Sequence, residues 1–194
     1  MARPSAVYSV VALATQPLRL LYRLDVRGKE NVPEGGFVLA ANHQSSFDPW
    51  PLGLPLYPRF LRFMAKSELF WWPLGALIAA AGAFKVRRGQ ADREAIATAV
   101  ELVKAGEIVV MFPEGTRQTK GLRKKHEWRP RTGAARIAWD ARAPIVPAAI
   151  KGTDRLARLG KQHVAYGKPI EPSEDPQETT DRVMAEIYRL YETL

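Results

Sequence analysis

The chain of 194 residues contains no cysteine and only three histidines, His43, His126 and His163. Without cysteine, the protein cannot form disulfides, use a thiolate nucleophile or hold zinc through sulfur ligands. Acidic residues are also scarce: 20 Asp and Glu stand against 29 Lys and Arg, which gives a net charge of +9. This excess predicts an anionic partner, such as a lipid surface, a phosphorylated substrate or a nucleic acid.

No apolar run is long enough to cross a bilayer as a helix. The longest uncharged stretch, residues 69–84, has 16 residues, whereas a transmembrane helix needs about 18–20. Pro73 would also break or kink it. The stretch fits a buried helix, a wall for acyl chains or a segment half inserted at a membrane interface, which Trp71 and Trp72 favour slightly.

An apolar stripe at helical spacing runs through the N-terminal residues and is interrupted at Pro17. The stripe consists of Val7, Val10, Val11, Ala14, Leu18 and Leu21. With basic residues on both sides, it predicts an amphipathic helix at a membrane interface, although a helix that packs on the core fits the spacing equally well. A short signal peptide fits less well, because the periodicity continues past Arg19. We therefore divide the chain into this N-terminal helix, residues 1–24, and a single domain, residues 25–194.

Strand and helix signals alternate along the second part of the chain. Strands are expected at residues 37–41, 83–87, 108–112 and 145–150, and helices from Asp92 to Gly106, over 132–141 and after the cap Asp175. This alternation predicts an α/β fold with one mixed, mostly parallel sheet flanked by helices.

His43 and Asp48 directly follow the first expected strand, at the sheet edge where α/β proteins commonly place their sites. Five residues apart, they do not share one face of a helix, but across a turn the carboxylate can reach the imidazole. Such a contact fixes the tautomer and leaves the other ring nitrogen basic. Taken alone, the spacing more often belongs to a helix-capping aspartate and a surface histidine.

A second motif, residues 112–117, ends the third expected strand and opens a turn. Gly115 permits close approach of the backbone, Thr116 offers a hydroxyl, and Arg117 offers a planar fork suited to phosphate. Glu114 would repel a phosphate, so we expect it to accept from a glycerol hydroxyl or to orient Arg117. A tight turn with a solvated arginine explains the same residues.

Further positive charge lies in residues 82–89 and 117–131. Lys85 and Arg87 fall on one side of an expected strand with Arg88 at its end, which fits an anion contact or a charged sheet edge. Residues 117–131 hold seven Lys and Arg against one Glu. We expect this segment to contact anionic lipid or donor phosphates, or to form a solvated loop.

Taken in order, four segments resemble the sequence blocks of the glycerophospholipid acyltransferase family, and within it the 1-acyl-glycerol-3-phosphate acyltransferases. They are NHQSSFD (residues 42–48), GAFKVRRG (82–89), FPEGTR (112–117) and IVPAAI (145–150). The resemblance implies acyl transfer from a thioester donor, acyl-CoA or acyl carrier protein, to the free hydroxyl of 1-acyl-glycerol-3-phosphate, with no metal or other cofactor. It implies His43 as general base and Asp48 as its orienting partner. The substrate-binding residues that it implies are Lys66, Arg88, Glu114, Gly115, Thr116 and Arg117.

Two departures from the family's pattern concern the acceptor. Arg87 stands where an Asp is often found, and residues 128–133, WRPRTG, replace a Phe-Lys-x-Gly pattern. A lyso-ornithine lipid or lyso-glycerophosphocholine is therefore an alternative acceptor. A non-catalytic basic protein that binds membranes or nucleic acid is a second alternative, although the chain carries no nucleic-acid-binding signature.

The same features predict where the protein works and what it binds. We expect a peripheral or monotopic enzyme on the cytoplasmic face of the cell membrane. Its expected partners are the lysophospholipid, the thioester donor and the anionic membrane surface, but not nucleic acid.

Overall fold

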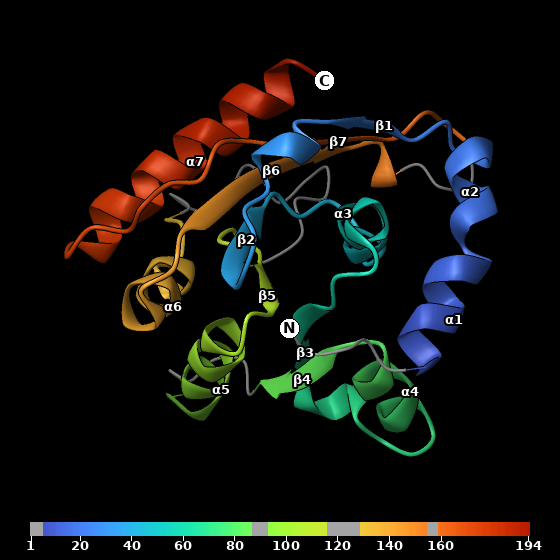
Figure 1. Ribbon diagram of the computed structural model, residues 1–194, viewed down its shortest axis with the longest axis horizontal. Helices are drawn as coiled ribbons and strands as arrows, with labels where there is room; N and C mark the ends of the chain where they lie inside the picture. Colours follow the sequence, from blue (N-terminus) through green and yellow to red (C-terminus); the bar gives the residue numbers. More distant parts are fainter. Residues whose placement is uncertain (1–5, 87–92, 116–128, 155–158) are drawn as a thin grey trace.

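The computed structural model describes residues 6–86, 93–115, 129–154 and 159–194. A single sheet runs through it, with the strand order β1-β7-β6-β2-β5-β3-β4 (Figure 1). The strands are β1 (Asp25–Arg27), β2 (Phe37–Ala41), β3 (Leu61–Lys66), β4 (Ala83–Val86), β5 (Ile108–Met111), β6 (Ile145–Lys151) and β7 (His163–Tyr166). The α-helices are α1 (Ala6–Ala14), α2 (Gln16–Leu21), α3 (Pro49–Gly53), α4 (Leu74–Ala80), α5 (Arg93–Lys104), α6 (Gly133–Ala141) and α7 (Pro176–Glu192). Short 3₁₀ helices span Lys29–Asn31, Leu54–Leu56 and Ser67–Leu69.

Five neighbouring strands, β6, β2, β5, β3 and β4, run parallel. β7 pairs antiparallel with β6, and β1 pairs parallel with β7. The expected fold, a mixed and mostly parallel sheet flanked by helices, is confirmed. Because the five strands point the same way, the loops that follow them meet at one edge of the sheet.

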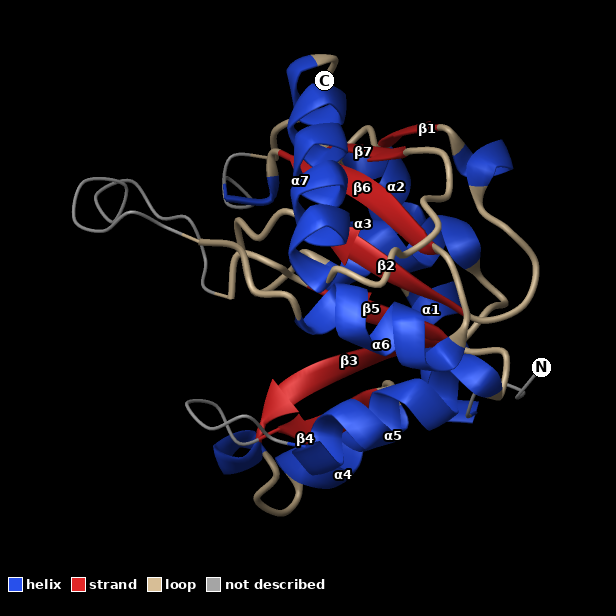
Figure 2. Ribbon diagram, turned by 90° about the vertical axis from the view of Figure 1, so that its left-hand side faces the viewer, coloured by secondary structure: helices blue, strands red, loops and turns tan. Residues whose placement is uncertain are grey.

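Side chains of β2 alternate between two apolar cores, one on each face of the sheet. Val38 and Ala40 pack with residues of α5, α6 and α7, while Phe37 and Leu39 pack on the opposite face with Leu52 of α3 and others. Figure 2 shows α5, α6 and α7 together on the first face. Every β2 residue is buried, as expected of a central parallel strand covered on both faces.

Most expected elements match the structure to within a residue. β2 has the predicted bounds, β5 ends one residue early at Met111, and β6 extends through Lys151. α7 is capped as predicted, because the Asp175 carboxylate accepts from the Gln177 N–H at 2.8 Å. Arg87 at the expected end of β4 and Asp92 at the expected start of α5 lie outside the described residues. β1 and β3 were not predicted.

The N-terminal stripe forms two helices, α1 and α2, that meet at Thr15, and Pro17 lies in the first turn of α2. The alternative of a core-packing helix is wrong: Ala12 is the buried residue of α1, α2 has none, and Leu20 is 83% exposed. Other apolar side chains exposed here are Val7, Val10, Val11, Leu13 and Leu21. The two helices thus present an apolar surface to the outside.

Tyr8 attaches α1 to the body of the protein. Its hydroxyl donates to the Arg59 carbonyl at 3.2 Å, and its ring packs edge-on against Phe60 at 4.7 Å between centroids. Burial raises the pKa of Tyr8 to about 12, although a hydrogen bond with the Leu61 backbone opposes this change. The exposed apolar face of α1 is therefore held in a fixed position.

Residues 69–84 do not form a buried helix, and this alternative is wrong. Pro73 precedes the seven-residue helix α4, in which Gly75 is the buried residue. Leu69, Trp71, Trp72 and Leu77 are exposed, Trp72 by 84%. α4 packs beside α1 (Figure 1), so the exposed apolar side chains of the two helices lie in one region. In the described part of the chain, no helix combines the length and the apolar character needed to cross a membrane.

Candidate active site

His43 follows β2 and Asp48 precedes α3, and the turn between them brings the two side chains together. Asp48 Oδ2 lies 2.7 Å from His43 Nδ1. An ionised carboxylate only accepts hydrogen bonds, so in the neutral ring Nδ1 carries the proton and Nε2 keeps its lone pair. The Asp48 side chain is fully buried, whereas that of His43 is 13% exposed. The contact that the spacing allowed is thus present in the structure.

The loop after β5 packs directly against His43. The Phe112 ring stacks on the imidazole, with centroids 4.2 Å apart and planes 19° from parallel. The buried Glu114 accepts a hydrogen bond from the His43 backbone N–H at 3.0 Å. This contact of Glu114 was not anticipated, and its expected contact with a substrate hydroxyl stays a prediction.

The residues at and after the end of β6 hold the His43–Asp48 loop from another side. Asn42 makes two hydrogen bonds to the backbone of Ile150, donating to its carbonyl at 2.9 Å and accepting from its N–H at 2.7 Å. The Thr153 hydroxyl donates to Asp48 Oδ1 at 2.5 Å. Asn42 and Thr153 are both buried, so these hydrogen bonds hold the loop from the interior of the protein.

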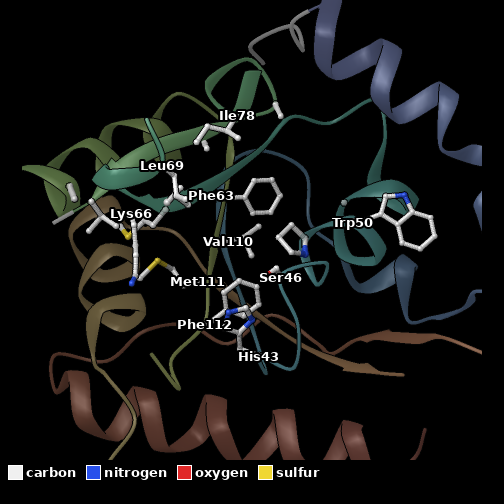
Figure 3. A pocket seen from close by; sticks show the side chains of 18 of the residues that line it. His43, Ser46, Trp50, Phe63, Lys66, Leu69, Ile78, Val110, Met111 and Phe112 are labelled. Atoms are coloured by element: carbon white, nitrogen blue, oxygen red, sulfur yellow. The ribbon is translucent and has the colours of Figure 1, made fainter. Parts of the chain in front are cut away.

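A pocket of about 840 Å³ opens beside His43 (Figure 3). It lies where β3 and β5 separate: their pairing ends at Phe63 and Val110, and the next residues of β3 pair with β4 instead. The side chains that line it come from both faces of the sheet, from α5 and α6 on one and from α1, α3 and α4 on the other. Most are apolar, so the pocket suits a hydrocarbon chain.

Two cationic residues line the same pocket as His43. Lys66 ends β3, and Arg131 stands just before α6. The Arg131 side chain lies against the backbone of Gly115, where a Cβ atom would come within 2.6 Å of its Nε. Gly115 also has φ +69°, so a glycine here fits both the turn and the arginine.

The structure brings together His43, Asp48, Lys66, Glu114 and Gly115 of the expected site residues. Arg88, Thr116 and Arg117 lie outside the described residues, as do His126 and residues 117–128 of the basic segment. His163, the remaining histidine, lies on β7 with Nδ1 3.1 Å from an Asp25 carboxylate oxygen.

Three residues of the site were given no role from the sequence: Phe112, Arg131 and Thr153. Arg131 had a signal, since it stands two residues before Gly133 as the lysine does in Phe-Lys-x-Gly. Thr153 had none, because its contact with Asp48 joins positions 105 residues apart.

The arrangement supplies a basic ring nitrogen, an apolar pocket and two cations for an anionic group. It can therefore remove a proton from a substrate that carries both a hydrocarbon chain and negative charge. Among the described residues, no cluster of His, Asp and Glu side chains is suited to holding a metal ion.

Comparisons with known proteins agree with this chemistry. A family model described as "Acyltransferase" matches residues 23–151. The 1-acyl-sn-glycerol-3-phosphate acyltransferase of Bacillus subtilis is 36% identical over 77% of this chain and 74% of its own length. The proteins of that name from Streptococcus pneumoniae and Saccharomyces cerevisiae are 28% and 32% identical, and the matches span 61% and 47% of their lengths.

A solved structure shares the fold. The 1-acyl-sn-glycerophosphate acyltransferase PlsC of Thermotoga maritima superposes with a TM-score of 0.70 over 96% of this chain and 86% of its own, at 24% identity.

Proposed function

Because this chain belongs to the acyltransferase family, we propose that it transfers a fatty acyl group from acyl-CoA or acyl carrier protein to the free hydroxyl of 1-acyl-glycerol-3-phosphate, giving phosphatidic acid. The observation that carries the proposal is the contact of the buried Asp48 with His43 at the edge of an apolar pocket. The acceptor named for the relatives from Bacillus subtilis and Streptococcus pneumoniae supports this choice.

In the proposed reaction, His43 is the general base and Asp48 orients it. His43 Nε2 takes the proton of the acceptor hydroxyl as the oxygen adds to the thioester carbonyl. The carbon–sulfur bond then breaks, and the leaving thiolate takes a proton from the imidazolium. Asp48 stabilises the positive charge that the ring carries between these steps. The reaction needs no metal and no protein nucleophile.

The acceptor phosphate binds, in this proposal, to the cationic residues around the pocket. Lys66 and Arg131 line it, and the family resemblance adds Arg88, Thr116 and Arg117. Glu114 and Gly115 shape the loop that carries Thr116 and Arg117. The pocket between β3 and β5 takes an acyl chain, with Leu69 and Ile78 from the apolar segment in its wall.

A thiol-release assay tests the proposed reaction. Purified protein should release free thiol from acyl-CoA or acyl carrier protein only when a lysophospholipid is added. A panel of lysophosphatidate, lyso-glycerophosphocholine, lyso-ornithine lipid and monoacylglycerol identifies the acceptor, and lysophosphatidate should be used best. The absence of thiol release with every acceptor, in folded protein supplied with either donor, would contradict the proposal.

Arg131 offers a test of phosphate binding with a matched control two residues away. Arg131→Ala should raise KM for lysophosphatidate and reduce the preference over monoacylglycerol, since a charge-assisted hydrogen bond is lost. Arg129 is also exposed and does not line the pocket, so Arg129→Ala should change neither quantity. Equal effects of the two substitutions would exclude Arg131 as a phosphate ligand.

We further propose that the protein attaches to one leaflet on the cytoplasmic face of the membrane. The support is the exposed apolar surface of α1, α2 and α4, which is larger than isolated surface residues explain. Since α1 also lines the pocket through Tyr8, Val11 and Ala12, the membrane would lie next to the route by which a lipid enters.

Flotation with anionic liposomes tests this attachment. The protein should float and stay partly bound in high salt, because apolar insertion is insensitive to ionic strength. Val10→Asp together with Leu20→Asp should abolish the salt-resistant part. Trp139→Asp serves as the control, since Trp139 is an exposed aromatic residue on α6, on the other side of the molecule (Figure 1). Protein that stays unbound at low salt would contradict the proposal.

A further inference from the structure

The Asp48 carboxylate receives hydrogen bonds from two separate parts of the chain. Oδ2 accepts from His43 Nδ1 and from the backbone N–H groups of Gln44 and Ser45 at 2.7 and 2.9 Å, all within one loop. Oδ1 accepts from the Thr153 hydroxyl at 2.5 Å, and Thr153 follows the distant strand β6. Residue 153 lies beyond the stretch that the family model matches.

We propose that Thr153 is a positioning residue of the acyl transfer, which fixes the rotation of the Asp48 carboxylate so that Oδ2 faces His43. This inference rests on the proposed function, in which His43 is the general base. The torsion that turns an aspartate carboxylate is broad and has no strong preference of its own. A donor to the second oxygen, Oδ1, therefore restricts this rotation more than the contacts within the loop would alone.

The fold holds Thr153 in place with little freedom. Gly152 before it has φ +98°, and a Cβ atom there would meet the Lys161 carbonyl oxygen at 2.6 Å. The turn after β6 therefore requires glycine. The two hydrogen bonds between Asn42 and Ile150 join the ends of β2 and β6. They keep the turn at a fixed distance from the loop that carries His43 and Asp48.

No other group readily takes the place of the Thr153 hydroxyl. The Asp48 side chain is fully buried and Thr153 is 1% exposed, so water does not readily replace a lost donor. Without the donor, the carboxylate can turn so that Oδ2 moves away from His43 Nδ1. The hydrogen bond that fixes the tautomer of His43 then weakens.

Other charged groups near the ring stay the same when Thr153 is changed. They are Asp48 on the same loop, Glu114 on the loop after β5, which binds the His43 backbone N–H, and Lys66 and Arg131 across the pocket. A change in the tautomer of His43 therefore reports the Thr153–Asp48 contact.

The experiment compares Thr153→Val with Thr153→Ser and with a matched control. Valine keeps the shape and removes the donor, whereas serine keeps the donor. Thr180→Val is the control, because Thr180 is equally buried and its hydroxyl also makes one hydrogen bond, to the Pro176 carbonyl in α7. Nitrogen NMR of the full chain without substrates follows the tautomer of His43. Its signals are assigned with His43→Gln, since the chain has only three histidines.

Thr153→Val should weaken the preference of neutral His43 for the Nδ1–H tautomer. At the optimum, kcat should fall about tenfold to a hundredfold, the range for one hydrogen bond to a charged group, while KM for both substrates changes little. Thr153→Ser and Thr180→Val should keep the tautomer of His43 and the kcat of the unchanged protein.

A folded Thr153→Val variant with the same tautomer and kcat as the Thr180→Val control would overturn the inference. If Thr153→Val does not fold, Thr153→Ala is measured in the same way, and an unchanged tautomer of His43 in that variant overturns the inference as well. The NMR readout needs no substrate. A protein that fails to acylate lysophosphatidate would refute the proposed function, and the role of Thr153 toward Asp48 would still be tested.

Discussion

Asp48→Asn separates the charge of Asp48 from its geometry. The asparagine carbonyl oxygen can accept the three hydrogen bonds that Oδ2 now receives from residues 43–45. Its amide group can donate to the Thr153 oxygen, which reverses the present hydrogen bond. The loop should therefore keep its shape, and the substitution should remove the negative charge beside the His43 ring.

The loss of rate follows from the attraction that disappears. Opposite charges about 4 Å apart attract by about 4 kcal/mol at an effective dielectric constant of about 20. Each step of about 1.4 kcal/mol is a factor of ten in rate, so kcat should fall by about a thousandfold. The imidazolium loses its counter-charge, so the acid limb of kcat should move to lower pH.

Single-turnover thiol release over a range of pH measures both quantities. The control is Asp181→Asn, which removes an exposed carboxylate on α7 that accepts from the Gln177 side chain. Retention of more than about a tenth of kcat by folded Asp48→Asn protein would refute the role given to Asp48.

Three further predictions concern the same loop and its supports. His43→Ala should lower kcat by about 10²–10⁴ and should leave the urea midpoint of unfolding nearly unchanged; turnover near that of the unchanged protein would refute the general base. Asn42→Ala should lower the free energy of unfolding by about 2–6 kcal/mol in urea titrations, since two buried backbone groups of Ile150 lose their partners. A loss below about 1 kcal/mol would contradict the role given to these two hydrogen bonds. Tyr8→Phe keeps the ring contact with Phe60 but removes the hydrogen bond to Arg59. It should lower the free energy of unfolding by about 0.5–1.5 kcal/mol in the same assay, and a larger decrease than that of Asn42→Ala would contradict this prediction.

The central strands could be predicted because burial on both faces leaves a continuous apolar run in the sequence. Residues 37–41 and 145–150 are such runs, and β2 and β6 match them within one residue. β1 has three residues, two of them charged, and depends on pairing with β7, which is about 138 residues away. β3 carries Arg62 and Lys66 and is only partly buried. Neither strand has a local signal strong enough to be recognised.

The site was predictable to the extent that its residues follow strands in short motifs. His43 and Asp48 share one loop, and Glu114 and Gly115 directly follow a buried run, so strand order alone brought them to one edge. Thr153 could not be predicted, because its partner is set by the register between β2 and β6. The exposure of α1 and α2 could not be predicted either, since an apolar stripe has the same spacing whether it faces a core or a membrane.

The register between β2 and β6 links the stability of the protein to the geometry of its site. Asn42 and Asp48 belong to the loop that carries His43, and both are bonded to the end of β6 or the turn after it, through Ile150 and Thr153. A shift of β6 by one residue would break both contacts and would also turn the side chains of β6 to the opposite face. Each β6 residue from Ile145 to Ile150 is buried, so such a shift would disrupt the packing of the cores on both faces of the sheet. The apolar packing that holds β6 in register therefore also determines where the Asp48 carboxylate stands beside His43.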